Sequence, residues 1–166
     1  GVVGVATPDV AADDWIELYI NTNSANIGTT SSFSIEIDNG NDGVDWTGSL
    51  RVTNGAFSAS NYVGTGTYTD TDAGDYIVMG NPVSTNNIDH TGVVKITLKD
   101  PSGAVLDEVV FGGGAGQAPS GLAISSVSST PDLESVFRYP NGTDTDTDDA
   151  DFIIYQPTIG AANAIT

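Results

Sequence analysis

Residues 15–20 read Trp15-Ile16-Glu17-Leu18-Tyr19-Ile20, a strict alternation of two sets of side chains. One set is aliphatic, and the other combines two aromatic residues with an acid. Successive side chains of a β-strand point to opposite faces of its sheet, so this period of two predicts a strand rather than a helix. The stretch therefore sets the expectation of an all-β protein.

The same alternation recurs along the chain, and turn signals separate the alternating stretches. Asp38–Gly43 is one such signal, and Asp100–Gly103 is another, with Pro at the second position of a type I turn. No window predicts a convincing amphipathic helix, although Asp9–Asp14 could form a single turn. Further strands are predicted at Val2–Ala6, Phe33–Ile37, Leu50–Thr53, Tyr76–Met79, Val94–Lys99, Val105–Phe111, Leu122–Ser125, Ser135–Tyr139 and Phe152–Tyr155. About ten short strands without helices indicate an antiparallel β-sandwich.

Length and composition restrict the class of protein. The 166 residues suit one domain spanning 1–166, and the absence of Cys excludes disulfides and thiolate chemistry. The 22 acidic residues outnumber four basic ones, for a net charge of −18. Nucleic-acid binding needs clustered Lys and Arg, so that class is excluded, and anionic membrane surfaces are disfavoured for the same reason. No stretch approaches the ~18 apolar residues that predict membrane insertion. The start at Gly1, without Met, predicts a secreted chain that has lost its signal segment.

The distribution of the acids predicts calcium. Eighteen of the acids are Asp, and eleven of these Asp fall in three short clusters. Carboxylates at alternate positions of a loop can converge on one Ca²⁺ ion, which takes roughly six to eight oxygen ligands. Adaptation of the surface to high salt is a second explanation of the acidity, and the two are compatible. We predict structural calcium at Asp144, Asp146, Asp148, Asp149 and Asp151, at Asp70, Asp72 and Asp75, and at Asp38 and Asp42.

Each of these motifs also has a plainer interpretation. Residues 38–45 match only part of the EF-hand pattern, and a tight turn or hairpin loop explains them as well; residues 144–151 could be a solvated acidic loop. Asn141-Gly142-Thr143 is either a glycosylation sequon or a turn. Glu17 is expected to bind Arg138 or backbone N–H groups. Arg138, one of only four cations, is expected to pair with an acid.

Four stretches resemble one protein family in order along the chain. Asp14–Tyr19 resembles the "EWIELYN" opening strand of bacterial lamin tail domains, and Thr97–Val109 resembles their "LYDxxGxxVDxV" hairpin. Ser135–Gly142 is similar to the "SxxRxPDG" segment. Asp151-Phe152 followed by Pro157–Asn163 is similar to the "DF…TPGAAN" close. The resemblance implies an immunoglobulin-like β-sandwich of lamin-tail type and a non-catalytic role in adhesion, tethering or structure.

The chain departs from that family between residues 20 and 75. The family's "DLSGWTL" stretch should follow Tyr19 within about ten residues, but its nearest counterpart is Asp45–Leu50, behind the strand predicted at Phe33–Ile37. We therefore expect an inserted strand or hairpin in 20–75.

The chain offers no nucleophile motif and a single His, so we predict that it is not an enzyme. We expect a secreted, calcium-stabilised structural protein that binds copies of itself, forming an extracellular filament or surface layer by strand addition or head-to-tail contacts. Val2–Val5 and Ala161–Thr166 are candidate connectors, unless Val2–Val5 is the sandwich's own first strand. One alternative is an accessory module of a secreted hydrolase that recognises a glycan or peptide through Trp46, Tyr62 and Tyr68. Another is a calcium-dependent adhesin.

Overall fold

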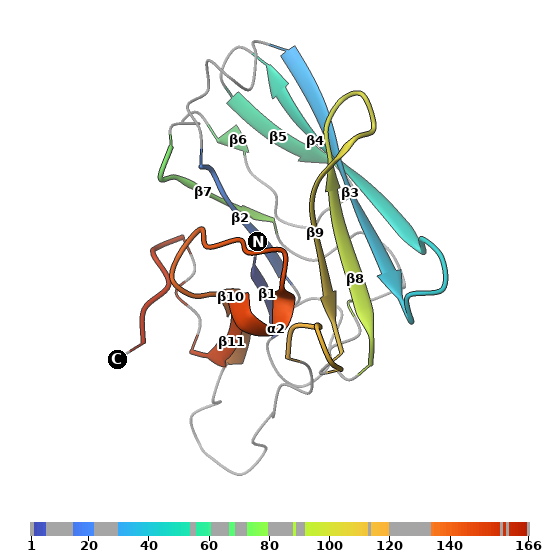
Figure 1. The fold of residues 1–166 in the computed structure, drawn as a ribbon. Helices are drawn as coiled ribbons and strands as arrows, with labels where there is room; N and C mark the ends of the chain where they lie inside the picture. Colours follow the sequence, from blue (N-terminus) through green and yellow to red (C-terminus); the bar gives the residue numbers. More distant parts are fainter. Residues whose placement is uncertain are drawn as a thin grey trace.

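The computed structural model describes most of the chain, and element labels follow Figure 1. The described residues are 2–5, 15–21, 30–53, 56–60, 67–68, 73–79, 88, 92–112, 114–119, 134–156, 158 and 160–165.

These residues form two antiparallel sheets (Figure 1). Sheet A has the order β11 (Phe152–Tyr155), β10 (Glu134–Arg138), β1 (Val2–Val5), β2 (Trp15–Tyr19) and β7 (Tyr76–Met79). Sheet B has the order β6 (Thr67–Tyr68), β5 (Ala56–Ser60), β4 (Trp46–Thr53), β3 (Thr30–Asn39), β8 (Val94–Lys99) and β9 (Val105–Phe111). One short helix, α2 (Asp148–Asp151), is described in addition. The predicted all-β, antiparallel character is confirmed.

One apolar core joins the two sheets. Sheet A contributes Ile16 and Met79, and sheet B contributes Ile35 and Ile96, all of them buried. Apolar faces of two sheets that pack on each other remove this surface from water, which is the main free-energy gain of a sandwich. The architecture is therefore sandwich-like.

Two tight connections follow the turn chemistry of the sequence. The loop between β3 and β4 is held by Asp38, whose Oδ1 accepts the backbone N–H groups of Asp42 at 2.9 Å and Gly43 at 3.1 Å. Between β8 and β9, the N–H of Gly103 donates to the carbonyl of Asp100 at 2.9 Å. Both predicted hairpins are confirmed.

The first strand lies in the interior of sheet A. Residues 2–5 pair with β10 over four positions, and residues 2–4 pair with β2 over three. Val2–Val5 is therefore an integral strand of sheet A in this structure, as the competing interpretation expects, and its role as a connector between copies stays a prediction. A strand rich in Val is well suited to this central place, because β-branched residues favour extended backbone.

Other differences concern short elements. The strands β5 and β6 and the helix α2 were not predicted, and β3 extends at both ends beyond Phe33–Ile37. The strands β3 to β6 occupy the region 20–75, where extra strands were expected. The predicted strand Leu122–Ser125 and the possible turn Asp9–Asp14 lie outside the described residues. Within the described ranges, no helix has the length and apolar character needed to cross a membrane.

Candidate functional site

The two faces of β2 lie in different surroundings. Ile16 and Ile20 belong to the core, and Leu18 packs against it. Glu17 and Tyr19 point to the opposite face of sheet A, yet Glu17 is only 2% exposed. This outer face is therefore covered, and the cover consists of the loop after β10 and the segment after β11.

Glu17 fastens the segment after β11 to sheet A. Its Oε2 accepts the backbone N–H of Gly160 at 2.6 Å. Of the two partners expected for Glu17, the backbone N–H is the one found. Burial raises the pKa of the Glu17 carboxyl above its ordinary value of 4.5, and the hydrogen bond from Gly160 opposes that rise.

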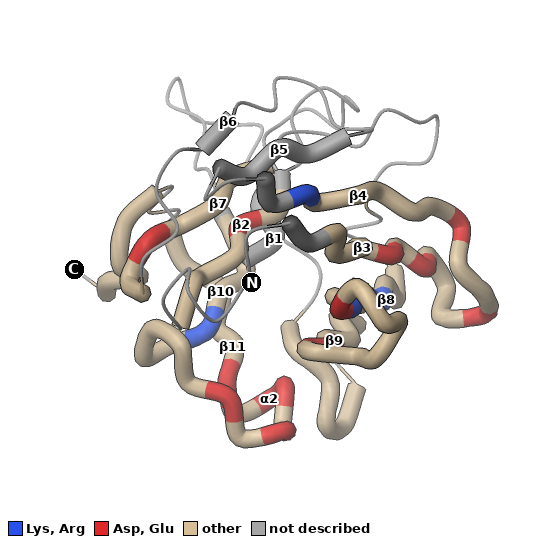
Figure 2. Tube along the Cα trace, turned by 90° about the horizontal axis from the view of Figure 1, so that it is seen from above, with Lys and Arg blue, Asp and Glu red and all other residues tan. Residues whose placement is uncertain are grey.

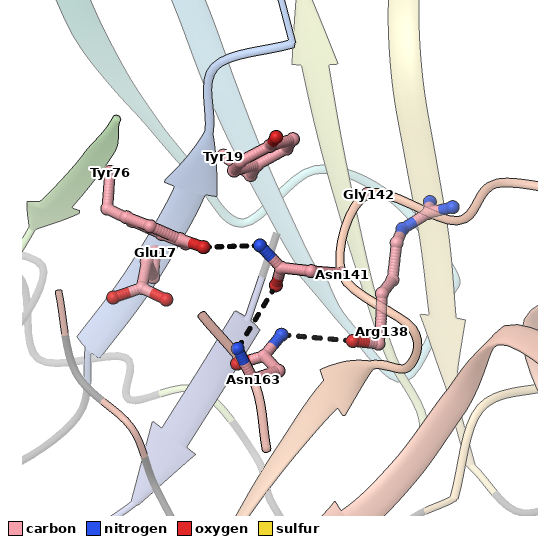
Figure 3. Close-up of a pocket in the computed structure, with 7 residues that line it drawn as sticks. All are labelled: Glu17, Tyr19, Tyr76, Arg138, Asn141, Gly142 and Asn163. Carbon is pink, nitrogen blue, oxygen red and sulfur yellow. Dashed lines mark hydrogen bonds between the residues drawn. The ribbon is translucent and has the colours of Figure 1, made fainter. Parts of the chain in front are cut away.

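Asn141 connects three parts of the chain. Its Nδ2 donates to the hydroxyl of Tyr76 on β7, and its Oδ1 accepts the backbone N–H of Asn163 at 3.3 Å (Figure 3). Asn163 in turn donates from Nδ2 to the carbonyl of Arg138 at 2.9 Å. The N–H of Thr143 donates to the carbonyl of Pro140 at 3.0 Å, so residues 141–143 belong to a turn, and glycosylation of Asn141 stays a prediction.

Gly142 completes the cover for a steric reason. It has a φ of +71°, a conformation that residues with a Cβ rarely adopt. A Cβ at this position would lie 2.9 Å from Cε1 of Tyr19. The turn therefore needs glycine both for its backbone and for its contact with the Tyr19 ring.

These residues surround a small polar pocket (Figure 3). It offers about 20 Å³, which is roughly the room that one water molecule needs. Burial raises the pKa of the Tyr76 hydroxyl, and the hydrogen bond with Asn141 opposes that rise. A sugar or a peptide side chain would not fit in it. The lining residues are Glu17, Tyr19, Tyr76, Arg138, Asn141, Gly142 and Asn163.

Arg138 is the centre of the charged network beside the pocket. The residue is 5% exposed, and its guanidinium lies over the ring of Phe152, 4.9 Å from the centroid. Nη2 contacts Oδ1 of Asp107 at 2.6 Å, and Nη1 contacts Oδ1 of Asp144 at 2.7 Å. Nη1 also lies 3.6 Å from Oδ2 of Asp151. The predicted pairing of Arg138 with an acid is confirmed, and it involves three acids rather than one.

The acidic stretch 144–151 folds around protein donors. Asp151 is buried and accepts both the N–H and the Oγ1–H of Thr145, each at 2.7 Å. Asp148 accepts the N–H of Val110 at 2.9 Å, and Asp149 accepts the N–H of Gly116 at 3.1 Å. The hydrogen bond from Arg138 lowers the pKa of Asp144, whereas burial raises that of Asp148. Figure 2 shows these acids around α2, beside the basic position on β10.

Four of the five carboxylates predicted to share one ion therefore contact protein groups, and not all the same ones. Asp144 and Asp151 come together at Arg138, while Asp148 and Asp149 face the edge of β9 and the loop after it. Asp146 is exposed, and its N–H donates to Asp144 at 3.3 Å. Within the described ranges, no three acidic or His side chains are grouped so that they could hold an ion. Calcium binding stays a prediction.

The other two clusters are only partly described. Asp38 is 4% exposed and holds the β3–β4 turn, with Nζ of Lys95 at 3.9 Å from its Oδ2, whereas Asp42 is exposed. Asp75 contributes its backbone carbonyl to the N–H of Ile20 at 2.9 Å. Asp70 and Asp72 lie outside the described residues.

For several residues of this region, the sequence alone predicted no role in a site. Tyr76 and Asp107 lie on predicted strands, and Asn163 lies in a stretch that resembles the lamin-tail close, but no local pattern joins them. Their meeting depends on sheet order, which brings β7 and β10 into one sheet and β9 beside it. The sequence held one signal that the outer face of sheet A is covered: the second set of side chains in residues 15–19 combines two aromatic residues with an acid.

No family model, curated protein or solved structure matches the chain. The resemblance to lamin tail domains therefore stays a hypothesis.

The first prediction concerns Arg138. Replacement by Met leaves the buried Asp151 next to Asp107 and Asp144 without a cation. We expect Arg138→Met to lower the free energy of unfolding by about 3 kcal/mol, measured by urea denaturation at neutral pH. Arg51→Met, which removes an equal charge from an exposed position, is the control and should change stability by less than about 0.5 kcal/mol. Equal losses in the two variants would contradict the central role of Arg138.

The second prediction concerns pH. The folded state raises the pKa of Glu17, so it binds a proton that the unfolded chain releases above about pH 4.5. Wild type should gain stability relative to Glu17→Gln as the pH falls through the folded pKa, and the gain should level off below 4.5. Urea unfolding of both proteins between roughly pH 4 and 7 measures the difference. If the difference in the free energy of unfolding between the two proteins did not change with pH, it would show that burial does not raise the pKa of the Glu17 carboxyl.

Proposed function

We propose that this chain is a secreted, non-enzymatic structural protein that assembles with copies of itself into an extracellular filament or layer. The immunoglobulin-like class of sandwich is part of the proposal, and two antiparallel sheets around a common core support it.

The observation that carries the proposal is that the polar side chains around the pocket bind other parts of the same chain. Among the described residues, Glu17, Asn141 and Arg138 have the chemical character of ligand-binding groups, and all three fasten one piece of sheet A to another piece of the chain. The space left between them suits one water molecule. This arrangement is typical of a unit built for mechanical integrity.

A contact surface for a second copy lies at the edge of sheet B. Among the described strands, β9 is the outermost of that sheet, and its later part is occupied, because Val110 donates to Asp148 and its carbonyl accepts the N–H of Ala118. Its first two residues, Val105 and Leu106, are 54% and 52% exposed. An outermost strand with exposed apolar side chains can serve as a template for pairing with another strand. We assign this edge to contact between copies.

One aromatic residue on which the accessory-module alternative depends is buried, which weakens that alternative. Trp46 is 9% exposed and belongs to the core, so it offers no surface to a glycan or peptide. Tyr62 lies outside the described residues.

The charge of −18 sets the conditions for assembly. Copies of like charge repel at low ionic strength, while at ~0.15 M salt the Debye length is about 8 Å and close approach becomes feasible. Sedimentation and negative-stain microscopy of the purified chain, at low and at moderate salt, test the proposal. We expect assemblies at moderate salt, and a monomer at every salt concentration would overturn the proposed function.

The third prediction tests the β9 edge. Leu106→Lys places a charge on the open edge and should reduce the assembled fraction at moderate salt several-fold, measured by sedimentation. Val44→Lys is the matched control: Val44 is 51% exposed in the β3–β4 loop, and the variant changes the net charge equally. If both variants assemble as wild type does, the β9 edge is not the contact.

The fourth prediction concerns calcium, which we retain as part of the proposal. Binding to the folded state alone stabilises by about 2.7 kcal/mol at a hundred-fold excess over the dissociation constant. We expect a correspondingly higher melting temperature in calcium than in chelator, with ionic strength matched by NaCl. Equal melting temperatures would remove calcium from the proposal and leave salt adaptation as the explanation of the acidity.

A further inference from the structure

The strand β1 divides sheet A into two strand pairs. On one side β10 pairs with β11, and on the other β2 pairs with β7. Without β1, the inner edges of β10 and β2 would each lose a partner, and a slot one strand wide would separate them. Such unpaired edges bind an incoming strand through main-chain hydrogen bonds.

The two strand pairs are also joined by contacts that do not involve β1. Gly160, which follows β11, donates to Glu17 on β2 at 2.6 Å. Asn141, which follows β10, donates to Tyr76 on β7 (Figure 3). The residues around the pocket thus connect the two strand pairs of sheet A. They hold the pairs apart by the width of one strand.

The pair β10–β11 is further fixed to sheet B. Arg138 at the end of β10 contacts Asp107 of β9 at 2.6 Å. The ring of Phe152, at the start of β11, meets the ring of Phe111 edge-on, with centroids 5.6 Å apart. These contacts fix the β10 edge of the slot whichever chain supplies the strand.

The connection from β1 to β2 is long for adjacent antiparallel strands. Residues 6–14 number nine, whereas hairpin loops usually have about two to five. Fully extended, nine residues can span about 30 Å, far more than the distance between two paired strands. Residues 1–5 carry no charged side chain, so their transfer adds no side-chain repulsion between two chains of charge −18.

We propose that β1 is exchanged between copies, so that residues 2–5 of each copy fill the slot between β10 and β2 of the next. The proposal rests on the proposed function of self-assembly and adds a connecting strand to the contact proposed at the β9 edge. The exchanged strand makes the same two ladders as in the single chain, so exchange loses no pairing. Donating in one direction and accepting from the other gives an open chain of copies rather than a closed dimer.

Engineered cysteines distinguish exchange from pairing within one chain, because the natural sequence has no Cys. Val5 on β1 is opposite Glu134 on β10. Opposite residues of antiparallel strands have Cα atoms about 4.5–5.5 Å apart, which suits a disulfide. The test variant is Val5→Cys/Glu134→Cys. The control is Ser49→Cys/Ser60→Cys, a cross-strand pair between β4 and β5 in which no exchange is expected.

Both variants are assembled, oxidised and run on a denaturing gel without reductant, and free thiols are counted. Exchange predicts a ladder of covalent multimers for the test variant and a monomer with an internal disulfide for the control. Assemblies in which the test variant gives only an internal disulfide, or keeps both thiols free while the control oxidises, would overturn exchange but leave self-assembly standing. Absence of assemblies in wild type and variants alike would overturn the proposed function itself.

If the test variant does not melt cooperatively, Gly4→Cys/Ser135→Cys replaces it, because these two positions are also opposite each other. The same ladder is expected from this second pair, and an internal disulfide in assembled protein again contradicts exchange.

Discussion

A buried guanidinium must be matched by carboxylates, and in this protein Arg138 draws three of them from separate segments. Asp107 comes from the edge of sheet B, while Asp144 and Asp151 open and close the acidic stretch before β11. One side chain therefore fixes sheet A to sheet B and shapes the loop between β10 and β11. In a chain with 22 acids and four cations, placing one cation out of water is costly unless its partners are close. The acidic stretch meets that need.

The sequence was most informative where a local pattern alone determines the structure. The strands β7, β8, β9 and β11 begin and end at the predicted residues, because alternation and turn residues mark both ends. The strands β5 and β6 were missed because Ala56–Ser60 and Thr67-Tyr68 are short and poor in large apolar residues. The position of β1 between β10 and β2 could not be foreseen, since strand order depends on pairing between distant parts of the chain.

The candidate site shows the same limit. The partners of Glu17 and Arg138 were anticipated by type, because a buried acid needs a donor and a lone cation needs an acid. The identity of those partners was not, because Gly160 and Asp107 reach them only through tertiary structure. The Asp spacing in 144–151 suggested convergence on an ion. A loop can also turn successive carboxylates toward backbone N–H groups, and spacing does not distinguish the two.

The amide of Asn141 also has a bearing on how the protein ages. An Asn followed by Gly is the pair most prone to lose its amide, because the next backbone nitrogen can attack the side-chain carbonyl and close a five-membered ring. Here Tyr76 and Asn163 hold that side chain at both ends, so it is restrained from turning toward the nitrogen of Gly142. Ring closure would release ammonia, and hydrolysis of the resulting succinimide would place a new carboxylate near Glu17, where burial already disfavours negative charge. The hydrogen bonds that close the outer face thus also protect the covalent chain at Asn141.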